Sequence, residues 1–147
     1  MAGVIDTNIF LYGANADARE HRRARAFLQA ALESPDRWYT TEGIVYEFLR
    51  AATHPKVFDR PLQWDEAFGF LSVFLGAPNV SVLSAGETHW ELLDAQLRDL
   101  NQPGGNLFFD VRTAVLMKEH GVREIYTADT DFLQFADVRV VNPLRDG

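Results

Sequence analysis

The sequence predicts an α/β domain built around a mostly parallel sheet of five strands. Short apolar runs, such as residues 4–5 and 124–126, alternate with longer segments whose apolar side chains recur at spacings of three and four. Strands that alternate with helices form βαβ units, in which successive strands run parallel. A length of 147 residues and a hydrophobic content of 47% suit a single domain with one core. We therefore expect one α/β domain over residues 1–147.

The first half of the chain carries two of the strands and three helices. The expected elements are, in order, a strand at 4–5, helices at 9–14 and 19–33, a strand at 38–40 and a helix at 43–53. Helix 19–33 has its apolar side chains on one stripe, which predicts packing against a core. Thr40 or Thr41 can cap helix 43–53, and His54-Pro55 ends it because the residue before a proline disfavours the helical conformation.

The second half carries the other three strands. The expected elements are a helix at 64–75, a strand at 80–83, helices at 87–100 and 107–120, a strand at 124–126, a helical turn at 131–135 and a strand at 138–141. The stretch Phe68–Leu75 is apolar nearly all round, which predicts burial in the core or against another chain. Trp90 is expected on the apolar stripe of helix 87–100, and Gly121 is expected to end helix 107–120.

Composition excludes several classes of protein. A net charge of −7 argues against a passive nucleic-acid-binding module, which usually carries a basic surface. It argues less against an enzyme that gathers carboxylates around divalent cations. The absence of cysteine excludes disulfides and thiolate metal sites. No apolar run approaches the roughly 20 residues of a membrane span, and no signal peptide is visible, so we expect a cytoplasmic protein without a membrane partner.

Carboxylates stand at the ends of two expected strands. Asp6 follows Val4-Ile5 directly, while Asp129 and Asp131 follow strand 124–126. In open α/β sheets, ligands bind in the crevice outside the carboxyl ends of the strands. The alternative is that these acids cap the helices that follow, as Asp commonly does.

Two more acids stand on expected helices. Glu47 lies at the margin of an apolar face, where Arg50 at i+3 is an alternative, structural partner. Asp110 lies within an apolar stripe, where a carboxylate is costly unless a cation or hydrogen-bond donors compensate it. Lys118 is a possible ion-pair partner, but a metal ion is the more economical one.

These acids predict a site for divalent cations. A set of oxygen ligands suits Mg²⁺ or Mn²⁺, whereas the four histidines show no zinc-binding spacing. Closely packed carboxylates stay ionised only if cations hold them. Two such ions are a common device for the in-line attack of water on a phosphodiester.

At these residues the chain resembles the PIN-domain ribonucleases of the VapC toxin type. The resemblance runs from Val4–Asn8 through Glu47–Arg50 to Val140–Leu144, and Asn106–Asp110 and Tyr126–Phe132 are its strongest parts. It implies a three-layer α/β/α sandwich and Mg²⁺- or Mn²⁺-dependent endoribonuclease activity on single-stranded RNA. It also implies a homodimer and a cognate VapB-type antitoxin whose tail lies in a groove beside the acids.

The resemblance assigns roles to individual residues. Those matching its acidic, metal-binding quartet are Asp6, Glu47, Asp110 and Asp129. Asp131 becomes an auxiliary metal ligand, and Asn8 and Thr127 lie beside the site, where they orient ligands or waters. Whether Asp129 or Asp131 is the primary fourth ligand stays open. The acidic balance leaves RNA contacts to a few cations: Arg19, Arg22, Arg23, Arg50, Lys56, Arg112 and Lys118.

Two other functions fit the sequence less well. A catalytically silent PIN-like module that binds RNA or protein would have no need of four costly acids. A haloacid-dehalogenase-type phosphatase needs a second Asp two residues after its nucleophile, where this chain has Asn8. An endoribonuclease is therefore the favoured expectation.

Overall fold

A computed structural model describes residues 2–145 and contains a five-stranded sheet in the order β3-β2-β1-β4-β5, with every neighbouring pair parallel. The strands are β1 (Val4–Ile5), β2 (Trp38–Thr41), β3 (Val80–Leu83), β4 (Glu124–Tyr126) and β5 (Arg139–Val141). The helices are α1 (Thr7–Ala14), α2 (His21–Glu33), α3 (Glu42–Ala52), α4 (Trp64–Leu75), α5 (His89–Asp99) and α6 (Leu107–Glu119), with a 3₁₀ turn η1 (Asp131–Gln134).

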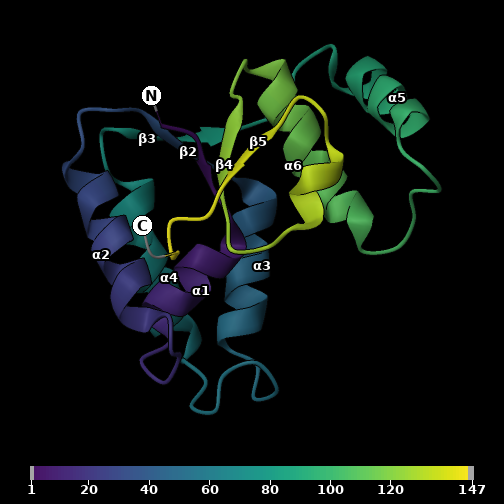
Figure 1. Ribbon diagram of the computed structural model, residues 1–147. Coiled ribbons are helices and arrows are strands. Elements are labelled where there is room, and N and C mark those ends of the chain that lie inside the picture. Colours follow the sequence, from purple (N-terminus) through teal and green to yellow (C-terminus); the bar gives the residue numbers. More distant parts are fainter. Residues whose placement is uncertain (1, 146–147) are drawn as a thin grey trace.

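Helices cover the sheet on both sides, so the expected three-layer α/β/α arrangement is confirmed. Helix α2 lies on one side of the sheet and α6 on the other, and α5 lies farther out beside α6 (Figure 1). Helices α1 to α4 pack on one another, whereas α6 packs with α5 and η1. Within residues 2–145, no helix has the length and apolar character that a membrane span requires.

The order in which strands are added to the sheet reverses at β1, and this position is the topological switch point of the fold. From β1 the chain moves outward to β2 and β3, and then crosses the other face to reach β4 on the opposite side of β1. Val4 is paired with both Tyr39 and Ile125. Such a switch point opens a crevice at the carboxyl ends of the two central strands. Asp6 therefore emerges next to the residues that follow β4.

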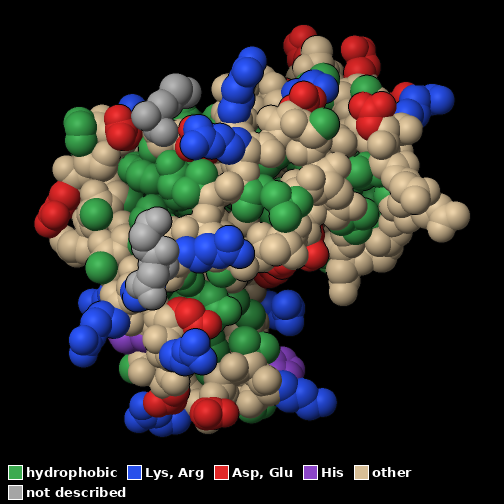
Figure 2. Space-filling model, viewed as in Figure 1, with side chains coloured by type: hydrophobic (Ala, Val, Ile, Leu, Met, Phe, Trp, Pro, Cys, Tyr) green, Lys and Arg blue, Asp and Glu red, His purple; other side chains and the backbone are tan. Residues whose placement is uncertain are grey.

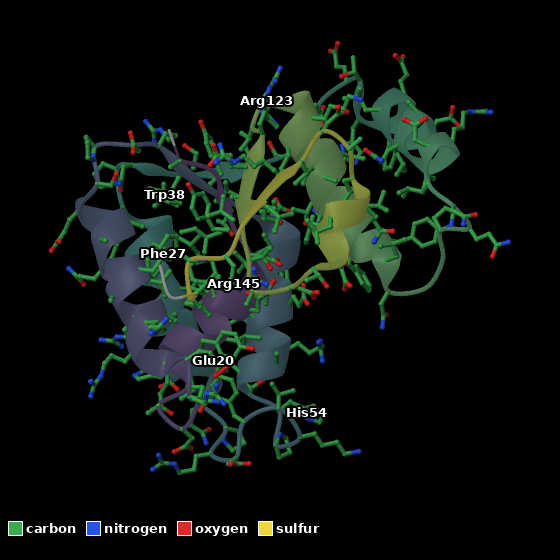
Figure 3. The ribbon with its side chains drawn as sticks, in the orientation of Figure 1. Glu20, Phe27, Trp38, His54, Arg123 and Arg145 are labelled. Carbon is green, nitrogen blue, oxygen red and sulfur yellow. The ribbon has the colours of Figure 1, made fainter. Side chains whose placement is uncertain are left out.

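Aromatic side chains hold the layers together. The Phe10 ring meets those of Phe48 and Phe74 edge to face, with centroid distances of 6.5 and 5.2 Å, and this contact joins α1 to α3 and α4. Phe27 of α2 and Trp38 of β2 lie against each other at 5.4 Å (Figure 3). These contacts belong to the hydrophobic core that the helices and the sheet share.

Several expected boundaries shift by one or two residues. The first helix starts at Thr7 because Asp6 caps it, and the second starts at His21. Thr41 caps α3, since its Oγ1 accepts from the Ile44 amide at 3.1 Å. Gly121 has φ +69°, the left-handed conformation expected after the last turn of α6.

The expectation that Phe68–Leu75 is buried in the core is wrong for part of the segment, and its alternative, burial against another chain, stays a prediction. Phe68 and Val73 of α4 are 46% and 58% exposed, because only Ala67, Leu71 and Phe74 of that helix are buried. Trp90 is 72% exposed. The residue of α5 that is buried is His89, which directly precedes Trp90. Its Nδ1 lies 2.9 Å from Glu119 Oε1, and both side chains are 7% exposed. An apolar stripe does not reveal whether another element is available to cover it.

Candidate functional site

A cavity of about 750 Å³ lies at the carboxyl edge of the sheet, where the switch point opens. Helices α3 and α6 supply its walls, and the ends of β1 and β4 supply its floor. All five acids singled out in the sequence line it: Asp6, Glu47, Asp110, Asp129 and Asp131. Residues far apart in the chain thus contribute carboxylates to one space.

Asp6 caps α1 and also lines the cavity, so the two interpretations of this residue are compatible. Its Oδ1 accepts from the Thr7 amide at 2.8 Å, and its Oδ2 accepts from the Thr127 hydroxyl at 2.9 Å. The residue is 9% exposed. Burial raises the pKa of Asp6 to about 6, assisted by the charges of Glu47 and Asp129 and opposed by the two hydrogen bonds.

Thr127 and Asn8 fix the orientation of Asp6. The Thr127 Oγ1 accepts from Asn8 Nδ2 at 2.8 Å and from the Asp129 amide at 3.0 Å. Both of these partners are donors, so the hydroxyl proton of Thr127 must point at Asp6 Oδ2. Asn8 Oδ1 in turn accepts from the Ala128 amide at 3.0 Å. These bonds tie the end of β1 to the loop after β4.

Glu47 and Asp129 are exposed at the mouth of the cavity. Glu47 Oε2 accepts from the Thr7 hydroxyl at 3.2 Å, and no ion pair joins it to Arg50 within residues 2–145. Asp129 Oδ1 accepts from the Asp131 amide at 3.1 Å. The charge of Asp129 is the main cause that raises the pKa of Asp131. The alternative that Arg50 neutralises Glu47 is therefore wrong.

Asp110 is half-buried on the inner side of α6. Burial raises its pKa to about 7, and the charges of Asp6, Asp131, Asp129 and Glu47 raise it further. Lys118 does not compensate it, because its Nζ lies 3.2 Å from Asp137 Oδ2 instead. In the described part of the chain, Asp110 forms no hydrogen bond or ion pair through its side chain.

The chemistry of this donor set suits a hard divalent cation. The lining carboxylates offer only oxygen ligands, and their mutual repulsion would be relieved by positive charge. Among residues 2–145, however, no three Asp, Glu or His side chains are already arranged to hold one ion. A cation would therefore require rotation of side chains, which the exposed Glu47 and Asp129 can undergo most easily.

Eight further residues line the cavity, and among them are two arginines and two exposed aromatic residues: Arg50, Arg112, Tyr46 and Phe109. The two arginines are among the RNA contacts expected from the sequence, whereas the two aromatic residues are not. The one feature of the sequence that marks these aromatic residues is that each directly precedes an expected acid. The other expected cations do not line it. On the face seen in Figure 2, Lys and Arg side chains are scattered among Asp and Glu and form no single basic patch.

We predict that Asp110→Asn stabilises the metal-free protein more at pH 8 than at pH 5. The folded pKa of about 7 lies above the ordinary value of 3.8, so the folded state binds more protons than the unfolded chain between these values. Asp110 therefore lowers the free energy of unfolding as pH rises through that window. After discounting for partial exposure, the gain at pH 8 is about 1 kcal/mol, or a few degrees in Tm.

Thermal unfolding in EDTA, followed by circular dichroism, measures this difference. Asp59→Asn is the matched control, because Asp59 is exposed and forms no hydrogen bond or ion pair with the described residues. An Asp110→Asn protein that unfolds at the wild-type temperature at pH 8 would show that the carboxylates do not repel one another as described.

Comparison with known proteins identifies the family. A family model described as the PIN domain matches residues 3–138. Ribonuclease VapC33 of Mycobacterium tuberculosis is 36% identical over 143 residues, which cover 96% of this chain and 97% of the relative. Ribonuclease VapC37 of the same species is 30% identical over 140 residues, covering 95% and 96% of the two chains.

Solved structures share the fold. Mycobacterium tuberculosis VapC20, described as a toxin that cleaves the sarcin-ricin loop, superimposes with a TM-score of 0.68 at 17% identity and covers 94% of this chain and 97% of its own. A chain of Rickettsia felis VapBC2, whose structure contains a promoter DNA fragment, superimposes with a TM-score of 0.69 at 14% identity. The match covers 97% of this chain and 98% of the other. With a full-length family match and relatives of this identity, the chain belongs to the PIN-domain family and is of the VapC type.

Proposed function

We propose that this protein is a Mg²⁺- or Mn²⁺-dependent endoribonuclease that hydrolyses phosphodiester bonds of single-stranded RNA. We propose further that it is the toxin of a toxin–antitoxin pair. Relatives that align with nearly its whole length are named ribonucleases, which supports the activity. The metal is inferred from the chemistry of the cavity, and the single-stranded substrate is inferred from the resemblance to the family.

One observation carries the proposal. Asp6 and Asp110 line the same cavity, each has a pKa raised by burial and by the neighbouring acids, and neither is joined to a lysine or arginine within residues 2–145. A structural role would provide a buried acid with a cation or with hydrogen-bond donors; Asp6 has donors in Thr7 and Thr127, but Asp110 has neither within residues 2–145. Crowded acids without such partners are instead suited to binding cations.

The residues of the cavity then have different roles in hydrolysis. Asp6 and Asp110 would hold the ion at the back of the cavity, with Glu47, Asp129 and Asp131 closing on it from the mouth. Bound divalent ions supply the positive charge that activates water and stabilises the leaving oxygen. Thr127 and Asn8 keep Asp6 in one orientation, because their hydrogen bonds leave its carboxylate little freedom to rotate. Asp129 lies nearer the Thr127 network than Asp131, which favours it as the fourth primary ligand.

We expect Asp6→Asn and Asp110→Asn each to lower cleavage of single-stranded RNA at least a hundredfold, since losing one ligand weakens both ion binding and its charge. Cleavage should require Mg²⁺ or Mn²⁺ and stop in EDTA. The measurement is the initial rate on a fluorophore-labelled RNA, with Asp59→Asn as the control. Wild-type rates in either variant would remove that residue from the site, and cleavage in EDTA would refute the metal. Binding of RNA without any cleavage would favour the silent module.

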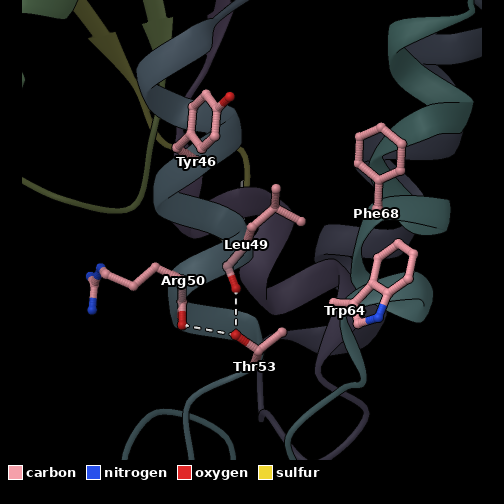
Figure 4. A pocket seen from close by; sticks show the side chains of 6 residues that line it. All are labelled: Tyr46, Leu49, Arg50, Thr53, Trp64 and Phe68. Atoms are coloured by element: carbon pink, nitrogen blue, oxygen red, sulfur yellow. Dashed lines mark hydrogen bonds between the residues drawn. The ribbon is translucent and has the colours of Figure 1, made fainter.

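For the partner, we propose a VapB-type antitoxin with an amphipathic segment that occupies the groove between α3 and α4. This groove of about 580 Å³ is lined by Leu49 and Thr53 on one wall and by Trp64 and Phe68 on the other (Figure 4). Trp64 is 74% exposed. Tyr46 and Arg50 line both the groove and the acid cavity, so a bound segment could continue into the catalytic space. Several neighbours of this fold are titled as complexes with a partner, VapBC or FitAB.

We expect Trp64→Ala and Phe68→Ala each to weaken antitoxin binding by tenfold or more, because exposed aromatic side chains that become buried dominate interface energies. RNA cleavage should be unaffected. The antitoxin is taken from the small reading frame expected beside this one, and the dissociation constant is measured by calorimetry. Trp90→Ala is the control, since Trp90 is equally exposed but lies on α5, outside the groove. Equal affinities for the Trp64 and Trp90 variants would exclude the groove. The expected homodimer stays a prediction.

A further inference from the structure

Arg112 is a cation of the acid cavity that no acid neutralises. Within residues 2–145 its guanidinium forms no hydrogen bond or ion pair, although five carboxylates line the same cavity. Arg50, which lines the same cavity, likewise has no acid partner within residues 2–145, whereas Arg60 lies 2.6 Å from Asp17 and Arg98 lies 2.8 Å from Asp94. The N–H donors of Arg112 therefore remain available to a ligand.

A glycine makes room for this guanidinium. A Cβ atom at Gly43, in the first turn of α3, would collide with Arg112 Nη1 and lie 3.4 Å from its Cζ. The side chain of Arg112 thus crosses from α6 to α3 and lies against the backbone there. Any larger residue at position 43 would push the guanidinium aside without changing its charge.

An exposed aromatic side chain stands beside Arg112. Phe109 precedes it by three residues in α6, a spacing that places both on one side of the helix, and both line the cavity. Phe109 is 67% exposed, so its ring is open to a ligand that enters the cavity. Its neighbour Phe108 is 45% exposed and does not line the cavity.

We propose that Arg112 and Phe109 form a nucleotide-binding subsite next to the carboxylates. Arg112 binds a phosphate adjacent to the one that is cleaved, and Phe109 stacks on a base of the same strand. The forked donors of a guanidinium match phosphate oxygens, and aromatic rings stack on bases that are not paired. The subsite rests on the proposed function, and it explains how a protein of net charge −7 can hold an RNA strand beside five acids.

The first experiment tests whether Arg112 binds a phosphate, which is the phosphate half of the proposal. It measures binding of a short unstructured RNA to an Asp110→Asn protein in Mg²⁺ by fluorescence anisotropy. Adding Arg112→Gln should raise the dissociation constant about tenfold and reduce the salt slope by about 0.7, the value for one phosphate contact on a single strand. Arg98→Gln, on exposed α5, should change neither quantity. Equal affinities and slopes for the two variants would overturn this half.

Gly43→Ala separates the position of the guanidinium from its charge. The substitution should weaken binding in the presence of Arg112 and have no further effect once Arg112 is Gln. Additive losses would mean that the new methyl group blocks the cavity directly, which contradicts the role assigned to Gly43.

Phe109→Ala and Phe108→Ala test whether Phe109 stacks on a base, which is the base half of the proposal. Phe109→Ala should weaken binding of single-stranded RNA by about tenfold and leave binding of duplex RNA unchanged, because paired bases cannot stack on it. Phe108→Ala should bind as its parent does. Equal effects of the two would overturn this half. Wild-type cleavage is assayed separately: RNA binding that depends on Arg112 without cleavage would support the subsite and contradict the nuclease, whereas no RNA binding would contradict both.

Discussion

Asp6 and Asp110 are carboxylates withdrawn from solvent at one cavity, and the proposed chemistry of the site depends on the cost of keeping both of them charged there. Burial alone raises the pKa of a carboxyl, and the neighbouring acids add to the effect. The helices that begin next to Asp6 and carry Glu47 are held by core packing, with Phe10 in contact with Phe48 and Phe74. Positive charge brought in from outside would convert this cost into binding energy.

Some side chains at the cavity are fixed by hydrogen bonds, and others are exposed or form no such bonds within the described residues. Thr127 uses its full hydrogen-bonding capacity to hold Asp6 and the loop after β4 in place. Arg112 has no such bonds within the described residues, and Glu47 and Asp129 are exposed. The back of the cavity is therefore ordered in advance, while its mouth can adapt to an ion and to a strand. An enzyme that must admit a flexible polymer benefits from this division.

Much of the fold and most of the acids could be predicted from sequence, because the signals are local. An apolar strand that runs straight into a carboxylate marks Asp6 and Asp129, and an acid within an apolar helical stripe marks Asp110. Partners could not be predicted, since they depend on which elements meet: nothing near Glu47 in the chain indicates Thr7, and nothing near Arg112 indicates Gly43. For the same reason the exposure of Phe68 and Trp90 was missed. Periodicity identifies an apolar face but does not identify its neighbour.

The central claim is that divalent cations bind between the carboxylates of this cavity, and diffraction from crystals soaked in Mn²⁺ tests it most directly. Anomalous scattering locates manganese without reference to any activity. The account predicts at least one manganese ion within about 2.5 Å of oxygen atoms of both Asp6 and Asp110. Manganese found only at surface acids such as Asp59, or a cavity that stays free of it at saturating concentration, would contradict the account.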